Sequence, residues 1–345
     1  MSMLLAIEGA ISQGVLWGLM TLGVYITFRI LNFADMTVDG SFALGGAVSA
    51  VLVVKGMNPW LSLLPAIVAG MLAGGVTGIL HTKIKIPEIL AGILTMIALY
   101  SINIRIMGQA NTSLLGEDTV ISLLNSIVGA SSNVLALSVG VVASIVAIVA
   151  LYWFFGTEVG SALRATGNNE YMVRALGTNT DTMKIIGLMV GNGLVALSGA
   201  FVAQSQGYAD VGMGQGTIVI GLASIIIGEV VFGNRFNFAY KLAAVVGGSI
   251  IYRIIIAVVL QIGMKSTDLK LLTAIIVAFA LAMPVVSKQI RYTLCVLFIG
   301  LMMLMTKQII LILFIVAIIL LIALLVNMIK KAMSSKSSEQ EVKGV

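Results

Sequence analysis

Charged residues are scarce in this 345-residue sequence, and their scarcity excludes most classes of soluble protein. Asp, Glu, Lys and Arg make up 10% of the chain, whereas hydrophobic residues make up 59%. Soluble globular domains carry about 25% charged residues, because that much polar surface must face water. The mean hydropathy of +1.11 therefore identifies an integral membrane protein.

Cysteine and histidine occur once each, as Cys295 and His81. A single cysteine in an apolar run forms no disulfide framework and no cysteine metal site. One histidine excludes HExxH and paired-histidine sites and leaves no Ser-His-Asp set, so a membrane-embedded enzyme is not favoured and no cofactor is expected. His81 stands beside Lys83 and Lys85 at the end of a predicted span, which is typical of the membrane interface.

Nucleotide-binding and export signals are also missing. The chain has no Gly-Lys dipeptide, so the GxxxxGK[ST] phosphate loop is absent and the polypeptide does not hydrolyse ATP itself. The N-terminus carries Glu8 where a signal peptide has its cationic region, which predicts that the first span is retained. The net charge of +6 sits mostly in short loops, so it indicates membrane orientation and not nucleic-acid binding.

An all-α, polytopic transmembrane bundle follows from the apolar segments, since a spanning helix needs about 20 such residues. We predict spans near 9–31, 41–54, 60–81, 87–108, 133–155, 184–206, 216–232, 240–262 and 268–287. The second and seventh are short and interrupted by glycine, a pattern typical of internal repeats around a translocation path. We expect a permease domain over residues 1–290, one span or a hairpin over 291–330, and a disordered cytoplasmic tail over 331–345.

The loop charges predict the orientation. Loops 109–125 and 207–215 hold acidic residues without Lys or Arg, whereas the loops on the other side carry most of the basic residues. Because basic loops face the cytoplasm, these two loops and the N-terminus should lie outside. Glycines four residues apart, such as Gly70, Gly74 and Gly78, predict close helix packing.

The longest segment of mixed polarity between spans covers residues 157–184. Thr157 can cap a first short helix, and Gly167 can end it in the left-handed conformation. One of the two asparagines that follow can cap a second short helix, which closes at Gly177. The segment is therefore predicted to be an ordered docking element, although short amphipathic helices also simply lie on lipid headgroups.

The run Gly160-Ser161-Ala162-Leu163-Arg164-Ala165-Thr166-Gly167-Asn168-Asn169, followed by Ala175-Leu176-Gly177, resembles the coupling loop of ABC importer permeases. The similarity is to the branched-chain amino acid and ribose permease superfamily, whose members usually carry a basic residue where this chain has Ser161. The resemblance implies ATPase-coupling roles for Glu158, Gly160, Leu163, Arg164, Gly167, Met172, Arg174, Leu176 and Gly177. We expect Leu163, Met172 and Leu176 to be apolar anchors in the ATPase, with the arginines at the rim.

A second polar stretch, Leu31-Asn32-Phe33-Ala34-Asp35-Met36-Thr37-Val38-Asp39-Gly40-Ser41, interrupts the first apolar segments. It resembles the superfamily's Asn-Phe-Ala signature after the first span and is similar to a subgroup linked to amino-acid uptake, notably of tryptophan and tyrosine. Non-helical polar backbone at membrane depth must face protein or a water cavity. Alternatively, Asp35 and Asp39 simply cap the second helix.

Residues in the stretches Asn32–Ser41 and Gly212–Gly233, at the two short spans, are the candidates for the translocation path. They are Asn32, Asp35, Asp39, Ser41, Gly216, Ser224 and Glu229. Glu229 and Arg253 are the deepest ionisable groups of the second half, and charges at that depth usually pair. Their predicted depths differ by about 10 Å of helix rise, so a mutual pair stays open.

The resemblance implies a bacterial plasma-membrane permease that works as a homodimer. ATP would be used by a separate cytoplasmic ATPase docked on residues 157–184, and an extracytoplasmic binding protein or lipoprotein would deliver a small solute, an amino acid. The alternative is a secondary carrier driven by an ion gradient, because broken helices and ionisable residues suit both classes.

Overall fold

The computed structural model describes residues 3–129, 131–233, 237–261 and 268–282, nearly all of them in helices. The chain divides into two compact units after Val258. In the second unit the structure describes a single helix that lies wholly inside it, α12 (Leu269–Ala282). The predictions for residues 291–330 and 331–345 lie outside the described residues.

Helices occupy the predicted spans of the first unit, with ends that differ by a few residues. They are α1 (Met3–Val24) with its π-helical continuation η1 (Tyr25–Ile30), α2 (Thr37–Val54), α3 (Pro59–Thr82), α4 (Glu88–Met107), α6 (Ser132–Gly156), α9 (Thr180–Gln206), α10 (Thr217–Phe232) and α11 (Phe238–Gln261). The first span begins at Met3 instead of residue 9, and the second begins at Thr37 instead of residue 41. Among the described residues seven helices are long and apolar enough to cross a membrane, whereas the seventh predicted span, at 16 residues, is shorter.

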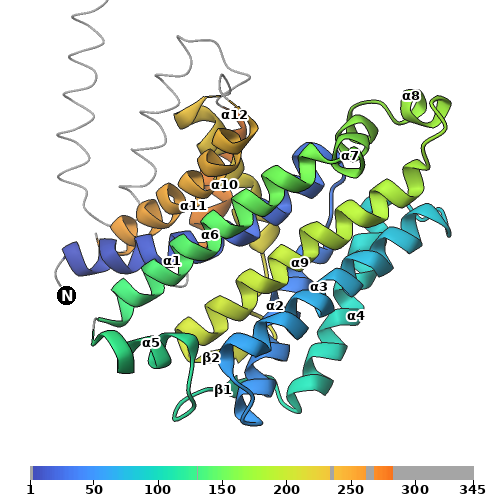
Figure 1. The fold of residues 1–345 in the computed structure, drawn as a ribbon. Helices are drawn as coiled ribbons and strands as arrows, with labels where there is room; N and C mark the ends of the chain where they lie inside the picture. Colours follow the sequence, from blue (N-terminus) through green and yellow to red (C-terminus); the bar gives the residue numbers. More distant parts are fainter. Residues whose placement is uncertain (1–2, 130, 234–236, 262–267, 283–345) are drawn as a thin grey trace, which may run out of the picture. The chain divides into compact units, whose positions relative to one another are not determined.

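The α9 helix is at the centre of the first unit, where it packs against α1, α2 and α3 (Figure 1). Small residues allow the close approach: a Cβ on Gly70 or Gly74 would overlap backbone carbonyl oxygens of α9, at Asn192 and Leu188. The predicted packing role of these glycines is therefore confirmed. Further along the sequence, α11 packs on α1, where Ile250 lies against Gly14.

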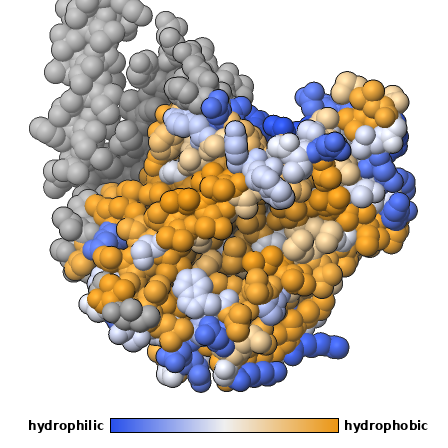
Figure 2. Space-filling model, viewed as in Figure 1, coloured by the Kyte–Doolittle hydropathy of each residue, from blue (hydrophilic) through white to orange (hydrophobic). Residues whose placement is uncertain are grey.

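Short elements occupy the two ends of the bundle. The strands β1 (Asn111–Ser113) and β2 (Tyr208–Asp210) pair antiparallel and lie near α5 (Val120–Val128), at the end opposite to α7 (Glu158–Asn168) and α8 (Glu170–Ala175) (Figure 1). Figure 2 shows hydrophobic surface over the flank between these two ends, with hydrophilic residues gathered at the ends themselves. This distribution fits helices that cross a membrane.

Candidate translocation and coupling site

Local capping defines α7 and α8, largely as the sequence predicts. The Thr157 hydroxyl accepts a hydrogen bond from the Gly160 amide at 3.2 Å, and the Asn169 side chain accepts one from the Met172 amide at 3.1 Å. Gly177 ends the second turn in the left-handed region, with a φ of 86°. Each of these features depends only on residues within a few positions along the chain.

Gly167 has a different role from the predicted one. The α7 helix continues through it to Asn168, and Gly167 is not in the left-handed conformation. Instead, a Cβ at this position would overlap the carbonyl oxygen of Ile30 and lie 2.8 Å from the α-carbon of Leu31. The prediction of a left-handed helix end is wrong, and glycine is needed here because two backbones touch.

The apolar residues of the coupling segment divide into a buried and an exposed set. Leu163 is fully buried beneath α7, against Gly187 of α9, so the expectation that it projects as an anchor for a partner is wrong. Met172 and Leu176 are 50% and 75% exposed, as an anchoring role requires, and Tyr171, which the sequence did not single out, is 87% exposed.

A cluster of charged side chains fixes α8 to the start of α9. The Arg174 guanidinium donates to Glu170 Oε1 at 2.9 Å and to Asp181 at 3.2 Å, and Lys184 Nζ donates to Glu170 Oε2 at 2.6 Å. Burial by itself raises the pKa of the Glu170 carboxyl, but the Lys184 hydrogen bond and charge, with Thr180 and Arg174, hold that pKa below its ordinary value of 4.5.

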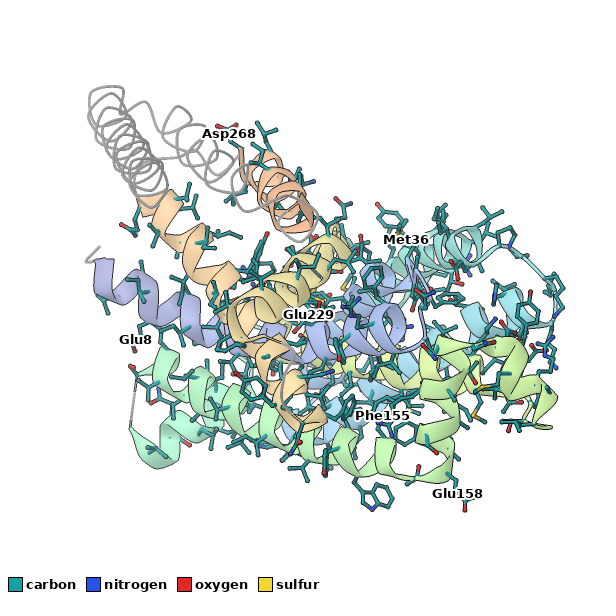
Figure 3. All side chains as sticks on the ribbon, turned by 90° about the horizontal axis from the view of Figure 1, so that it is seen from above. Glu8, Met36, Phe155, Glu158, Glu229 and Asp268 are labelled. Atoms are coloured by element: carbon teal, nitrogen blue, oxygen red, sulfur yellow. The ribbon has the colours of Figure 1, made fainter. Side chains whose placement is uncertain are left out.

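The other coupling arginine is also engaged within the chain. Arg164 donates to the Phe155 carbonyl at 2.9 Å, and its guanidinium lies 5.6 Å from the centroid of the Phe238 ring. Glu158, by contrast, points away from the bundle where α6 meets α7 (Figure 3). The arginines thus stabilise the coupling segment itself, whatever they contact on a partner.

Asp35 accepts a hydrogen bond from the first residue of α2, although Met36 and not Asp35 stands at the N-cap position of that helix. Asp35 is 1% exposed, and its two oxygens accept from the Thr37 amide at 2.9 Å and from the Asn192 side chain at 2.6 Å. The Thr37 hydroxyl continues the polar contacts to Thr77 of α3 at 2.6 Å. A buried carboxyl group thus links the second, third and ninth helices.

Asp39 caps a helix, but not its own. One carboxylate oxygen accepts from the Gly216 amide at 2.8 Å, and the other accepts from the Thr217 hydroxyl at 2.8 Å and the Ile218 amide at 2.9 Å. The two amides lie at the start of α10, where backbone N–H groups have no partner within the helix and the helix dipole favours a negative charge. The expectation that Asp39 caps α2 is wrong, and the two short spans meet through this carboxylate.

Glu229 pairs with Arg29 and not with Arg253. Arg29 Nε and Nη2 donate to the two Glu229 oxygens at 2.9 and 3.1 Å, a bidentate pair that joins η1 to α10. Arg253 instead lies over the Trp17 ring, 3.9 Å from its centroid. The possible pair between Glu229 and Arg253 is therefore ruled out in this structure.

The remaining path candidates differ in exposure. Asn32 is exposed and has a φ of 54°, which is uncommon for a residue other than glycine. Ser41 and Ser224 are both fully buried, and the Ser224 hydroxyl donates to the Ile220 carbonyl at 2.8 Å. Of the predicted residues, the structure brings only Asp39 and Gly216 together by a direct hydrogen bond, and the path role of the set stays a prediction.

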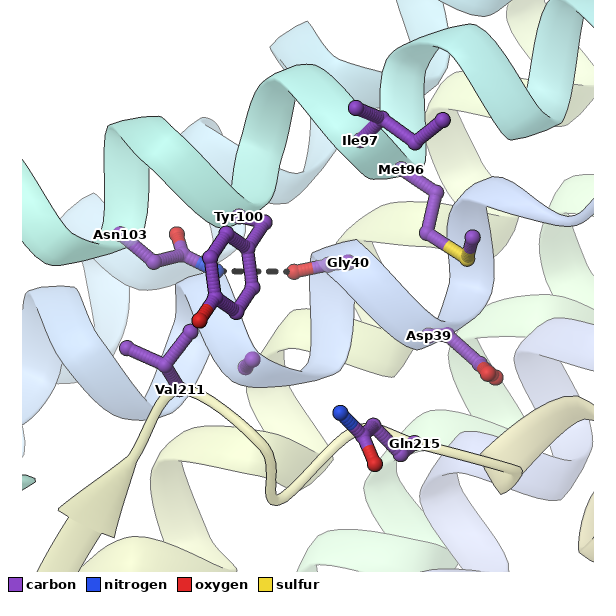
Figure 4. A pocket seen from close by; sticks show the side chains of 9 residues that line it. Asp39, Gly40, Met96, Ile97, Tyr100, Asn103, Val211 and Gln215 are labelled. Atoms are coloured by element: carbon purple, nitrogen blue, oxygen red, sulfur yellow. Dashed lines mark hydrogen bonds between the residues drawn. The ribbon is translucent and has the colours of Figure 1, made fainter. Parts of the chain in front are cut away.

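A cavity of about 460 Å³ lies beside Asp39, between α2, α4 and the non-helical segment 211–216 (Figure 4). The residues that line it are Asp39, Gly40, Ala43, Met96, Ile97, Tyr100, Asn103, Val211 and Gln215. Sequence reasoning missed Tyr100 and Asn103, because both fall inside an apolar span. The one sequence feature that could have pointed to them is the side-chain amide of Asn103, which stands in a segment otherwise suited to lipid.

Comparisons with known proteins agree on one kind of protein. Residues 6–280 match the family described as branched-chain amino acid transport system / permease component. A tyrosine transport system permease protein of Clostridioides difficile is 44% identical over 276 residues, which are 80% of this chain and 90% of that protein. A ribose import permease protein of Haemophilus influenzae is 28% identical over 209 residues, 60% of this chain and 64% of that one. No solved structure matches the chain.

Proposed function

This chain belongs to the family of branched-chain amino acid transport system permease components, and on that premise we propose that it imports an aromatic amino acid as a homodimer. It is the multi-pass permease subunit of an ABC importer for a small solute in the bacterial inner membrane, and a transport subunit instead of an enzyme. Family members work with an ATPase and a substrate-binding protein. The tyrosine transport relative supports an aromatic substrate.

The ATPase-coupled mechanism is supported mainly by the way α7 and α8 contact the membrane helices on one side and expose apolar side chains on the other. The α7 helix touches the end of the first span through Gly167, while α8 presents Tyr171, Met172 and Leu176 to the outside. We call these three residues the docking surface. Apolar and aromatic side chains at the centre of an interface generally supply most of its binding energy. A rigid contact on one side and an exposed surface on the other suit a segment that transmits motion from a partner.

The test is to purify the permease with its co-expressed ATPase and binding protein. Tyr171→Asp and Leu176→Asp should each reduce co-purification of the ATPase and tyrosine-stimulated ATP hydrolysis, by about tenfold for the loss of a central contact. The control is Leu115→Asp, because Leu115 is 89% exposed at the opposite end of the bundle. The control should leave co-purification of the ATPase unchanged.

The two rival outcomes are distinct. Unchanged assembly in both docking variants, with wild-type assembly intact, would place the ATPase contact elsewhere. Uptake by the wild-type chain alone, driven by an ion gradient without the ATPase, would instead establish the secondary-carrier alternative. The homodimer is tested separately by the mass of the purified complex.

A further inference from the structure

Leu115 is the most exposed large hydrophobic side chain among the described residues, at 89%. It lies in the turn that follows β1, at the end of the bundle opposite to α7 and α8 (Figure 1). Its neighbour Leu114 is 2% exposed and belongs to the same apolar cluster as Met107 and Val211. Burial of a leucine side chain stabilises a protein by about 1.5–3 kcal/mol. The chain thus uses one leucine of the pair for its own packing and leaves the other available to a partner.

Hydrogen bonds hold this turn in place. The Leu114 amide donates to the Gly207 carbonyl at 2.8 Å, at the end of α9, and the Glu117 amide donates to the Leu114 carbonyl at 3.1 Å. Further along the chain, the Val120 amide donates to the Gln204 side chain at 2.9 Å. A side chain that is presented by a fixed turn loses little conformational entropy on binding, which favours association.

Two carboxylates border the exposed leucine. Glu117 and Asp118 are both exposed, and neither forms an ion pair with a described residue. The segments around β1 and β2 add only Asp210 and contain no Lys or Arg. Lys55 and Arg105, at the same end of the bundle, belong to the ends of α2 and α4. A partner that matches this face therefore presents basic side chains, because opposite charges across an interface favour association.

Tyr208 adds an aromatic ring to the same face. It is paired with Ser113 across the two strands, and both residues are exposed. The next pair, Thr112 and Ala209, is buried. Since successive side chains of a strand point to opposite faces, Tyr208 and Ser113 point outward together. An apolar and aromatic centre with a charged rim is the usual composition of a protein–protein interface. We call the following residues the outer patch: Leu115, Glu117, Asp118 and Tyr208.

The outer patch is joined to the cavity beside Asp39 through β2. The strand continues into segment 211–216, where Val211 lines the cavity and the Gly216 amide donates to Asp39. A protein seated on the outer patch therefore lies at the end of the segment that leads to the cavity, which is the position required of a partner that delivers a solute. Lipid headgroups suit the patch less well, because interfacial anchors typically combine Trp or Tyr with Lys or Arg, whereas the charges here are acidic.

We propose that the outer patch is the docking site for a basic surface of the substrate-binding protein. Leu115 and Tyr208 fill the centre of the contact, and Glu117 and Asp118 pair with Lys or Arg side chains of the binding protein at its rim. This inference rests on the proposed function, which supplies the partner. It adds where on the permease that partner docks and which charge it carries there.

The test measures the affinity of the co-expressed binding protein, purified and loaded with L-tyrosine, for the full-length permease in lipid nanodiscs without the ATPase. Leu115→Asp should raise the dissociation constant about tenfold, the loss of one central contact. Leu115→Met keeps an apolar side chain and should bind like the wild type. Tyr171→Asp, at the opposite end of the bundle, is the matched control, and it should leave this dissociation constant unchanged while it reduces co-purification of the ATPase.

Charge reversal at the rim gives a second measurement. Glu117→Lys should weaken binding at about 50 mM salt and make the dissociation constant less sensitive to added salt, because exposed charges act through interactions that salt screens. Unchanged affinity in a normally folded Leu115→Asp variant, or in Glu117→Lys at low salt, overturns the proposal.

The lipid surface is the rival occupant of the outer patch. A fluorophore on Leu115→Cys in the Cys295→Ser background should escape quenching by nitroxide-labelled lipids, whereas one on Val146→Cys, in the middle of α6, should be quenched. Equal quenching at the two positions would assign the leucine to lipid and refute the docking site. Wild-type binding that neither patch substitution weakens rejects the outer patch alone, whereas tyrosine uptake without the ATPase or the binding protein rejects the proposed function.

Discussion

The α-carbon of Gly167 in α7 lies directly against the carbonyl oxygen of Ile30, the last residue of η1. No side chain fits between the two backbones, so a displacement of α7 toward η1 would push against the end of the first span. The η1 segment is π-helical, a geometry that is frequent at functional sites and in which the chain is wound more loosely than in an α-helix. The contact gives the coupling segment a direct mechanical connection to the membrane domain.

Gly167→Ala should weaken that connection. The added methyl group must push α7 away from Ile30, at a cost of about 1–3 kcal/mol for overpacking. We expect reduced tyrosine-stimulated ATP hydrolysis and a lower melting temperature of the purified complex. Gly156→Ala is the matched control, since a Cβ on Gly156 meets nothing within 4 Å. Equal activity of the two variants would show that the Gly167 contact transmits nothing.

The Arg29–Glu229 pair should respond to charge exchange. Arg29→Glu alone sets two carboxylates side by side and should reduce uptake, whereas Arg29→Glu combined with Glu229→Arg restores opposite charges and should recover part of it. Because the Arg29 side chain is 50% exposed, the coupling energy from a double-mutant cycle should be only about 0.2–1 kcal/mol. Arg105→Glu, at the far end of α4, provides the control. Additive effects of the two substitutions would mean that the pair has no energetic role.

Asp39→Ala should destabilise the start of α10. The substitution removes the acceptor for three hydrogen bonds, and loss of an N-cap costs about 0.5–2 kcal/mol. We expect faster hydrogen exchange of the Gly216 and Ile218 amides and a lower melting temperature. Asp118→Ala removes an exposed carboxylate in a connecting segment and should leave both unchanged. Slow exchange in the Asp39 variant would contradict the capping role.

The attachment of α8 should depend on acidity through Glu170. A carboxyl group whose pKa is lower in the folded chain adds stability above its ordinary value and loses it as the pH falls through the folded value. Protection factors of the α8 amides, which correct exchange for its intrinsic pH dependence, should therefore be high above about pH 5 and fall as the pH drops below the ordinary value of 4.5. Glu170→Gln should abolish this pH step, whereas Glu158→Gln, at an exposed position, should retain it. A step that persists in Glu170→Gln would assign it to another group.

The features that the sequence predicted well are those that local chemistry determines. Thr157, Asn169 and Gly177 cap or close short helices through contacts with residues a few positions away, so composition and spacing suffice to find them. The spans were likewise predicted from hydropathy alone, because lipid requires long apolar helices. The start of α2 was missed, because Asp39 and Ser41 look unsuited to a helix in lipid until their protein surroundings are known.

The features that the sequence did not predict depend on residues far apart in the chain. Gly167 touches Ile30 across more than a hundred positions, and no local pattern records that approach. The partner of Glu229 was missed for the same reason, since Arg29 sits at the end of the first span, 200 residues earlier. Leu163 has the same helical spacing as a surface anchor, and only the packing of α7 on α9 shows that it faces inward.

The separation between Asp39 and its donors has a consequence for how the protein is made. Asp39 precedes Gly216 by 177 residues, so the ribosome delivers the carboxylate to the membrane long before α10 exists. Until then the nascent bundle holds a carboxyl group without the amides that later donate hydrogen bonds to it. The insertion of α10 therefore supplies the hydrogen-bond donors that the earlier helix α2 lacks at Asp39. The packing of the first half is complete only after the second half has been synthesised.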